Sequence, residues 1–189
     1  MIQPGFSAID TKFGPIAILW WSDAAGPRVR QIFLCGRSDA AVTVGREFPG
    51  ARPGSHPAID DLCGRMQQFL DGHAVTFHLD RMAMEVCGEF QRNVLMAEYG
   101  IPRGWVSTYG LLARRVGAPG GARAAGRALA THPFPIVIPC HRAVRSDGSV
   151  GGYQGGGRMK RALLEMEGVE FDAGGRLKLN RVYYAGWHD

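Results

Sequence analysis

The chain contains 189 residues, carries a formal net charge of +5, and is 46% hydrophobic and 21% charged. These values describe a globular protein with enough apolar residues to bury a core, as one domain or two small ones. No apolar run approaches the roughly 20 residues that a membrane-spanning helix needs, and the first residues lack the basic and apolar regions of a secretion signal. We therefore exclude a membrane-spanning protein and expect a cytoplasmic one.

The four cysteines are spread along the chain, with no CxxC pair and no histidine at zinc-finger spacing. Such spacing favours reduced thiols over a disulfide framework, and it offers no ligand set for a structural metal. We expect no metal site. The cysteines are Cys35, Cys63, Cys87 and Cys140.

The first 83 residues predict a small α/β domain. Apolar, β-rich runs separated by glycine-containing turns predict antiparallel strands, and helical spacing of apolar residues predicts two helices. The first helix is expected to follow a Ser38 cap and the second to begin at Pro57. The predicted strands cover residues 6–10, 15–21 and 29–34, with a further strand at 75–79, and the first helix runs through Arg46.

The second part, residues 84–189, predicts a mainly helical domain. A helix at 85–99 is followed by a break, and Ser107 or Thr108 can cap the next helix at 109–116. A glycine-rich turn and a helix at 122–131 complete a helix-turn-helix outline. A helix at 158–167 and a terminal hairpin follow. The fold class is therefore α+β, with a strand–helix domain before a helical one.

The positive charge lies in the second part of the chain. Residues 1–83 hold 8 basic and 8 acidic side chains, whereas residues 84–189 hold 14 basic and 9 acidic ones, so this part carries the whole net charge. Between Ile101 and Arg161 there are ten basic side chains and one acidic one, Asp147. A basic surface of this kind attracts anions, and its concentration here suggests a polyanionic partner.

A candidate nucleophile lies in this basic part. The β-branched run Ile136–Ile138 predicts a short buried strand, and Pro139 is expected to end it. Cys140 follows, next to His141 and Arg142. An electropositive setting lowers the pKa of a thiol and yields a nucleophile. From residue statistics alone, however, a buried structural cysteine is the commoner interpretation.

The surrounding residues favour the nucleophile. The run Ile138–Arg142 resembles the active-site signature of the O6-alkylguanine-DNA alkyltransferases, direct-reversal repair proteins also called methylated-DNA–protein-cysteine methyltransferases. The resemblance extends in order from Phe90 to Gly168. Besides the signature it includes Phe90-Gln91, Val94, Ile101-Pro102, Gly104, Ser107, Tyr109-Gly110, Ala113, Arg123, Ser146-Asp147-Gly148, Gly151, Tyr153, Gly155-Gly156, Lys160, Leu163-Leu164 and Glu167-Gly168.

The resemblance implies roles for four catalytic residues. Cys140 would accept the alkyl group, and His141 would activate the thiol through a bridging water. Glu167 would orient His141, although an exposed acid at a helix end is the alternative interpretation of that residue. Tyr109 would contact the extruded base and assist the departure of the guanine. The resemblance also implies that the first domain is ribonuclease-H-like and only supports the reaction.

The predicted recognition helix is rich in small residues. Ala122 and Gly126 would let its backbone press into the minor groove of double-stranded DNA, whereas the alternative is an ordinary alanine-rich helix with solvated arginines. By resemblance, Arg123 would fill the space left by the flipped nucleotide. Three further arginines are expected to contact phosphates, and these are Arg114, Arg115 and Arg127.

The expected substrate pocket contains three departures from the family pattern. Residues 153–157 would form a flexible lip, and the pocket would be lined by Pro135, Ala143, Tyr153, Gln154 and Gly155. Ala143 stands where valine is usual, and Gln154 where small residues are common. His132 stands where asparagine usually fixes the hinge between the recognition helix and the active-site segment. The first two bear on the preferred alkyl group and the third on the rigidity of the site.

The sequence therefore predicts a monomeric DNA repair protein that needs no cofactor. It would transfer the alkyl group of O6-alkylguanine, and of O4-alkylthymine, to Cys140 once and irreversibly. Two alternatives are a non-catalytic module that binds alkylated bases and a helix-turn-helix transcription regulator. Cys140 argues against the first, because the cysteine is replaced in such relatives, and the lack of base-reading side chains on the recognition helix argues against the second.

Overall fold

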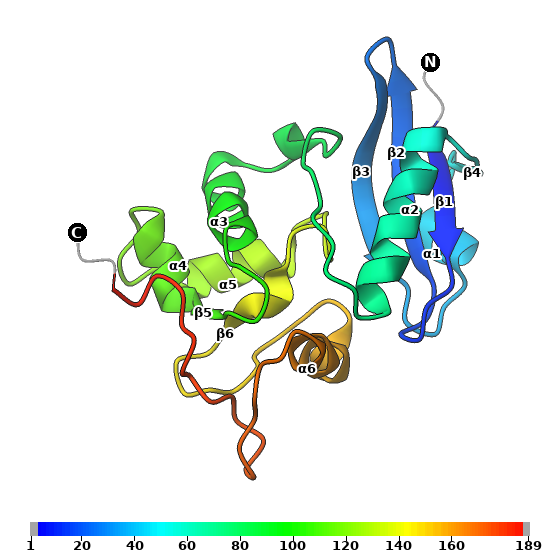
Figure 1. Cartoon of the computed structure of the whole chain (residues 1–189). Helices are drawn as coiled ribbons and strands as arrows, with labels where there is room; N and C mark the ends of the chain where they lie inside the picture. Colours follow the sequence, from blue (N-terminus) through cyan, green and yellow to red (C-terminus); the bar gives the residue numbers. More distant parts are fainter. Residues whose placement is uncertain (1–3, 187–189) are drawn as a thin grey trace. The chain divides into compact units, whose positions relative to one another are not determined.

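The computed structural model describes residues 4–186, which fold into two compact units (Figure 1). The first unit holds the chain up to Val86 together with Pro133–Val137, and the second holds Cys87–His132 and the chain from Ile138 onward. Thus the segment that follows His132 belongs to the first unit, and the chain returns to the second just before Cys140. The predicted boundary after residue 83 remains a prediction.

A four-stranded sheet forms the centre of the first unit. Its strands are β1 (Gly5–Ile9), β2 (Ile16–Asp23), β3 (Gly26–Leu34) and β4 (Arg52–Pro53), in the order β3-β2-β1-β4. β1, β2 and β3 pair in antiparallel fashion, as their alternating sequences predict, whereas the two-residue β4 is parallel to β1. The predicted trio of strands is confirmed.

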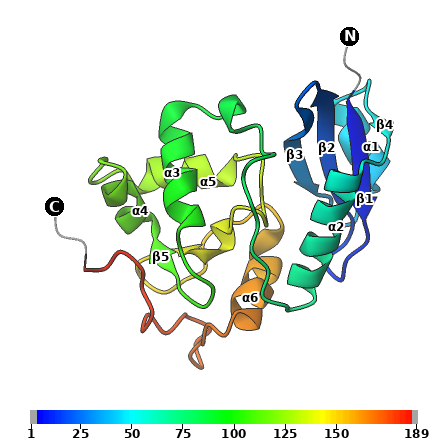
Figure 2. The same cartoon turned by 45° about the horizontal axis from the view of Figure 1, so that its top comes forward.

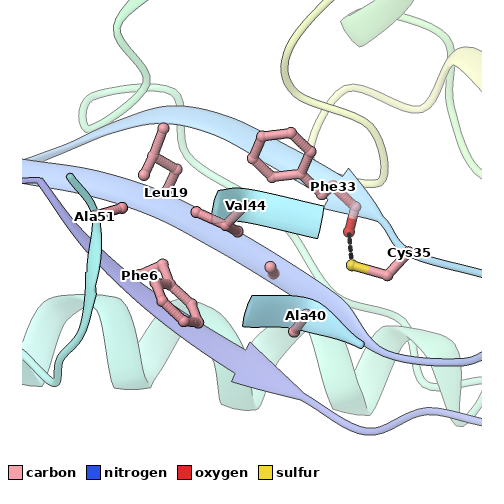
Figure 3. Packing of buried hydrophobic residues seen from close by; sticks show 8 residues of the cluster. Phe6, Leu19, Phe33, Cys35, Ala40, Val44 and Ala51 are labelled. Carbon is pink, nitrogen blue, oxygen red and sulfur yellow. Dashed lines mark hydrogen bonds between the residues drawn. The ribbon is translucent and has the colours of Figure 1, made fainter. Parts of the chain in front are cut away.

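Two helices cover the opposite faces of this sheet (Figures 1 and 3). α1 (Ala40–Glu47) is capped by Asp39, whose carboxylate accepts a hydrogen bond from the Val42 N–H at 3.0 Å, so the prediction of a Ser38 cap is wrong by one residue. α2 (Pro57–Leu70) begins at the predicted proline. Both helices present apolar residues to the sheet.

The strand predicted at residues 75–79 does not form. The outer edge of β3 is instead paired by residues 81–83, where Val29 donates to the Arg81 carbonyl and Ala83 donates to the Val29 carbonyl. The Thr76 carbonyl accepts a hydrogen bond from Arg65 of α2, so a side chain replaces the missing strand neighbour.

The core between the sheet and α1 is apolar and includes a thiol (Figure 3). Phe6, Leu19, Phe33 and Val44 are buried together, and the Cys35 Sγ lies 3.6 Å from the carbonyl oxygen of Phe33, to which it donates. Burial raises the pKa of this thiol. Cys35 therefore acts as a small core residue.

The described part of the second unit contains four α-helices, of which α3, α4 and α5 pack on one another (Figure 2). The helix predicted at 85–99 is divided, with a 3-10 turn at Met84–Val86 before the α-helix. The second and third helices of the unit form the predicted helix-turn-helix outline, with Thr108 as the cap of α4. The helices are α3 (Glu89–Tyr99), α4 (Tyr109–Arg115), α5 (Ala122–Ala130) and α6 (Gly156–Met166).

The segment before Cys140 contains no strand, so the strand predicted at Ile136–Ile138 is wrong. Ile136 has φ 74°, in the left-handed region that a β-branched residue rarely adopts, and this turn ends any extended run. The Cys140 N–H donates to the Ile138 carbonyl, and the residues Cys140–Arg142 form the 3-10 turn η2. The nucleophile candidate is thus held by a tight turn instead of a strand end.

Beyond η2, the chain closes the second unit with short pairings. β6 (Ala143–Val144) is parallel to β5 (Ser107–Thr108), and the predicted terminal hairpin is present as an antiparallel bridge between Phe171 and Leu177. Val144 and Leu177 share a small apolar cluster with Val106, just before β5, and with Leu164 of α6. Within residues 4–186, no helix is long and apolar enough to cross a membrane.

Candidate active site

Cys140 lies at the wall of a cavity in the second unit. Only 4% of the residue is exposed, and the cavity has a volume of about 440 Å³. The walls come from the start of α4, from α5, from the turn η2, from the segment after β6 and from the loop before α6. The lining residues are Tyr109, Ala122, Arg123, Gly126, Leu129, Ala130, Cys140, Arg145, Gly152, Tyr153 and Gln154.

The imidazole of His132 contacts the thiol directly. Its Nε2 lies 2.9 Å from the Cys140 Sγ, and both residues are buried. Burial lowers the pKa of His132 to about 3, so the ring is neutral at ordinary pH. The sequence predicts a hinge at this residue, and the structure adds a side-chain contact to the Cys140 thiol. His132 follows α5, and the side chain of Gln154 donates to its backbone carbonyl at 2.7 Å.

The resting thiol is protonated. Burial raises the pKa of Cys140 well above its ordinary value, and the nearby carboxylate of Glu98 adds to this effect, while Lys160 opposes it. The expectation that His141 and Arg142 make the thiol acidic is therefore not met. Arg142 points its charge at Glu167 instead, and burial lowers the pKa of His141, which favours the neutral ring. A proton must leave sulfur during any nucleophilic reaction.

His141, Arg142 and Glu167 form a buried ion cluster at the end of α6. The His141 Nε2 lies 3.0 Å from Glu167 Oε1, and Arg142 donates to both carboxylate oxygens at 2.8 and 2.7 Å. Arg142 also donates to the backbone carbonyl of Ile101. Burial disfavours ionised Glu167, but hydrogen bonds and charges from His141 and Arg142 outweigh it and lower its pKa to about 2. Glu167 is thus not an exposed helix-end acid.

A second polar group involves Tyr109, which lines the same cavity as Cys140. Tyr109 begins α4, and its hydroxyl oxygen accepts a hydrogen bond from Lys160 at 3.2 Å. Lys160 is buried and also donates to the carbonyls of Ala143 and Gly152. Burial raises the pKa of Tyr109 to about 12, with smaller contributions from Glu98 and Cys140. Tyr109 therefore keeps its phenol proton, and its oxygen already accepts a hydrogen bond from the Lys160 ammonium group.

Close packing around Tyr109 explains why residue 151, in the loop before α6, is a glycine. Gly151 has φ 72°, and a Cβ there would lie 2.8 Å from the Tyr109 hydroxyl oxygen. Any side chain at this position would push on the tyrosine as well as strain the backbone. Gly126 of α5 also faces this ring, since a Cβ there would lie 3.7 Å from it. Small residues thus bring the recognition helix and the loop close to Tyr109.

Exposed arginines lie on α4 and α5, and one of them lines the cavity. Arg123 lines it from α5, and Ala122 and Gly126 on the same helix line it as well. Arg127 is exposed one turn further along, while Arg114 and Arg115 are exposed in the last turn of α4. The ring of Tyr184 lies 5.7 Å from the Arg115 guanidinium.

Only some of the residues that the sequence predicts for the substrate pocket are found in the cavity wall. Tyr153 and Gln154 do, whereas Gly155, Ala143 and Pro135 are not among the described lining residues. Ala143 is fully buried behind the site, where its carbonyl holds Lys160. Pro135 belongs to the first unit.

Three residues of the site are missed by reasoning from the sequence. Arg145 lines the cavity, and Lys160 and Glu98 are buried near Tyr109 and Cys140. Lys160 matches the family pattern, which was a signal that could have identified it. Glu98 gives no signal, because it stands in α3 like any helix acid, yet burial raises its pKa to about 8.

Known proteins are similar to this chain in sequence. The family described as 6-O-methylguanine DNA methyltransferase, DNA binding domain, matches residues 89–169. A methylated-DNA–protein-cysteine methyltransferase from Methanothermobacter thermautotrophicus is 50% identical over 115 residues, or 61% of this chain and 64% of that relative, less than two thirds of its length. One from Mycobacterium bovis is 39% identical over 120 residues, or 63% of this chain and 67% of that relative.

The fold also matches a solved structure. The structure of Mycobacterium tuberculosis OGT in complex with DNA aligns with 86% of this chain and 92% of its own. The TM-score is 0.68 at 28% sequence identity. The similarity therefore extends over both units, beyond the part matched by the family.

Proposed function

Because the chain belongs to the family of methylated-DNA–protein-cysteine methyltransferases, we propose that it repairs alkylated DNA by direct reversal. The alkyl group of O6-alkylguanine is transferred to the Sγ of Cys140. The observation that carries this proposal is the position of a buried thiol at the wall of a cavity that is also lined by the small residues and the arginine of α5.

The damaged base enters the cavity from outside the double helix. A protein thiol has no access to guanine O6 in a stacked duplex, so the nucleotide is rotated out of the stack. Arg123, which lines the cavity from the exposed side of α5, fills the space that the base leaves. Ala122 and Gly126 present little bulk, which suits a helix that lies in the minor groove and must accept any sequence.

Arginines beside this helix hold the phosphate backbone. Arg114, Arg115 and Arg127 are exposed, and each phosphate contact adds affinity that falls as salt rises. The structurally similar M. tuberculosis protein forms a complex with DNA, and this supports DNA as the partner.

In the cavity, Cys140 carries out an in-line displacement. The sulfur forms a bond to the alkyl carbon while the bond from that carbon to O6 breaks, and the electron pair stays on the guanine. Charge then builds on the base, and a hydrogen-bond donor near it lowers the barrier. Tyr109 fits this role, because Lys160 already occupies the phenol oxygen and the O–H remains to face the base.

The reaction ends with a thioether. No water or second nucleophile readily cleaves a carbon–sulfur bond of this kind, so each molecule acts once. O4-alkylthymine presents an alkyl–oxygen bond of the same type, and we include it as a substrate. His141 and Glu167 support the turn that holds Cys140 through the buried ion cluster.

The test is intact-mass measurement after incubation with a duplex that contains O6-methylguanine. One methyl group should be gained, on the peptide that contains Cys140, with a plateau at about one equivalent per protein. Gain of a methyl on another cysteine, or repeated turnover, would contradict the proposal. A matched duplex with guanine in place of the lesion is the control.

A further inference from the structure

The site contains a direct contact between a base and the nucleophile. The His132 Nε2 lies 2.9 Å from the Cys140 Sγ, within hydrogen-bond distance, and both side chains are buried. His132 is also the position at which this chain departs from the asparagine that usually stands there. An amide at that position has no basic nitrogen, whereas an imidazole can take up a proton.

His141 is engaged elsewhere. Its Nε2 contacts Glu167, and Glu167 is neutralised by two hydrogen bonds from Arg142. This cluster fixes the ring and the turn η2. The imidazole of His132 contacts the sulfur directly.

We propose that His132 is the catalytic base that accepts the proton of the Cys140 thiol, a role that rests on the proposed alkyl transfer. As sulfur bonds to the alkyl carbon, the S–H proton moves to the Nε2 of His132, and the carbon–O6 bond gives its electrons to the guanine. The imidazolium then gives this proton to the guanine. The net result is that the thiol proton replaces the alkyl group on the base, and charge balances.

Burial opposes proton transfer within the resting pair, so the proton moves only as the sulfur bonds to the alkyl carbon. The pKa of His132 is lowered by burial, so the ring is neutral and can accept a proton, and burial keeps the thiol neutral. The same burial makes the imidazolium unfavourable, so the ring releases its proton again.

Gln154 positions this base. Its Nε2 donates to the His132 carbonyl at 2.7 Å, and its side chain lines the cavity. Two departures from the family pattern, at His132 and Gln154, are therefore in contact with each other. The loop before α6 thus holds the backbone that carries the base.

A test without DNA uses iodoacetamide, with the rate of Cys140 alkylation followed by peptide mass. The variant is His132→Gln, because glutamine keeps a hydrogen-bond acceptor at similar reach but cannot take a proton. The control is the same change at an exposed histidine, His78→Gln. We expect the His132 variant to react about 100-fold more slowly at neutral pH, as for loss of a general base, and the control to match wild type.

The pH profile separates a base from a structural residue. With His132, the rate should stay nearly constant from about pH 6 to about pH 9, because the resting pair keeps its protonation state there. Without it, hydroxide must first produce the thiolate, so the rate should rise about tenfold per pH unit. An unchanged rate, or a slower rate with a flat profile, would overturn the proposal.

An experiment with methylated DNA distinguishes a failure of this proposal from a failure of the proposed function. If the wild-type protein reacts with iodoacetamide as described but takes no methyl group from an O6-methylguanine duplex, the proposed function fails. If it does take the methyl group and His132→Gln transfers it equally fast, the role of His132 fails. His132→Asn, the residue usual in the family, is the second variant if the glutamine variant does not fold, and it should show the same rise with pH.

Discussion

The two units of the chain bury different kinds of side chain. The core of the first unit between the sheet and α1 is apolar, whereas the buried polar residues found among the described residues all belong to the second unit. The difference can be seen by comparing two buried thiols. The Cys35 thiol donates to a backbone carbonyl, and the Cys140 thiol contacts an imidazole beside a cavity.

This difference shows that burial alone does not make a cysteine reactive. Burial raises the pKa of both thiols. Cys140 differs in having a base within hydrogen-bond distance and space for an electrophile next to the sulfur. Among the described residues, the buried polar ones are Glu98, Ser107, His132, His141, Lys160 and Glu167.

The largest expected effect comes from exchanging the thiols one at a time. Cys140→Ala should abolish alkyl transfer and leave lesion binding intact, because the residues expected to contact DNA lie on α4 and α5. Cys35→Ala should leave transfer unchanged. The measurements are methyl incorporation by mass and duplex binding by fluorescence anisotropy. Transfer that survives in Cys140→Ala would remove the distinction between the two thiols.

The buried ion cluster should matter mainly for stability. Glu167→Gln leaves Arg142 without its buried carboxylate, and breaking such a pair costs about 3–5 kcal/mol of unfolding free energy. Since the folded pKa of Glu167 is about 2, below the usual 4.5, its contribution is present above about pH 4.5 and is lost as pH falls toward 2. Urea unfolding at several pH values measures both.

A neighbouring glutamate provides the control for that experiment. Glu165 forms an exposed pair with Arg161 at 2.8 Å on the same helix. Glu165→Gln should change stability by about 1 kcal/mol or less, because exposed pairs contribute little. Equal losses of unfolding free energy in the two variants would mean that the buried cluster stabilises the fold no more than an exposed ion pair does.

The arginine at the cavity should affect repair in duplex DNA but not the chemistry itself. Because Arg123 is proposed to replace the extruded base, Arg123→Ala should slow repair of duplex DNA by about tenfold or more while a free O6-alkylguanine base reacts nearly as before. Arg114→Ala should instead reduce the salt slope of binding by about one. Rates measured on both substrates decide this, and equal slowing of both would contradict the flipping role.

The sequence predicted three strands and both helices of the first unit and the helix-turn-helix outline of the second, but it did not predict the contacts among buried polar groups. Alternation identified β1, β2 and β3, and helical spacing with Pro57 identified α2, because each depends on neighbours in the sequence. The strand predicted at Ile136–Ile138 does not form. Three prolines around this run remove backbone donors from any strand ladder, and these are Pro133, Pro135 and Pro139.

The active site required the family resemblance, and part of it escaped even that. Cys140, His141 and Glu167 followed from matched positions. The contact of His132 with sulfur depends on where two turns meet in space, and no local pattern encodes it. Glu98 is the clearest omission, since only the fold shows that its side chain is buried near Lys160 and Arg142.

Glu98 gives the prediction with the smallest expected effect, and it tests how a buried polar residue of the second unit affects stability. Burial raises the pKa of this carboxyl from 4.5 to about 8, although the charges of Lys160 and Arg142 oppose the shift and Glu167 adds to it. The folded protein therefore binds a proton that the unfolded chain releases between about pH 4.5 and pH 8. Its stability should fall across that window, by at most about 1.4 kcal/mol per pH unit, and then become level.

Glu98→Gln removes this titration while keeping the size and polarity of the neutral side chain. The variant should match wild type near pH 4.5 and become progressively more stable than wild type up to about pH 8. Unfolding free energies from urea titrations, taken as the difference between variant and wild type at each pH, cancel the groups that titrate in both. A difference that does not change with pH would mean that Glu98 is ionised in the folded protein and that the polar core holds its charge.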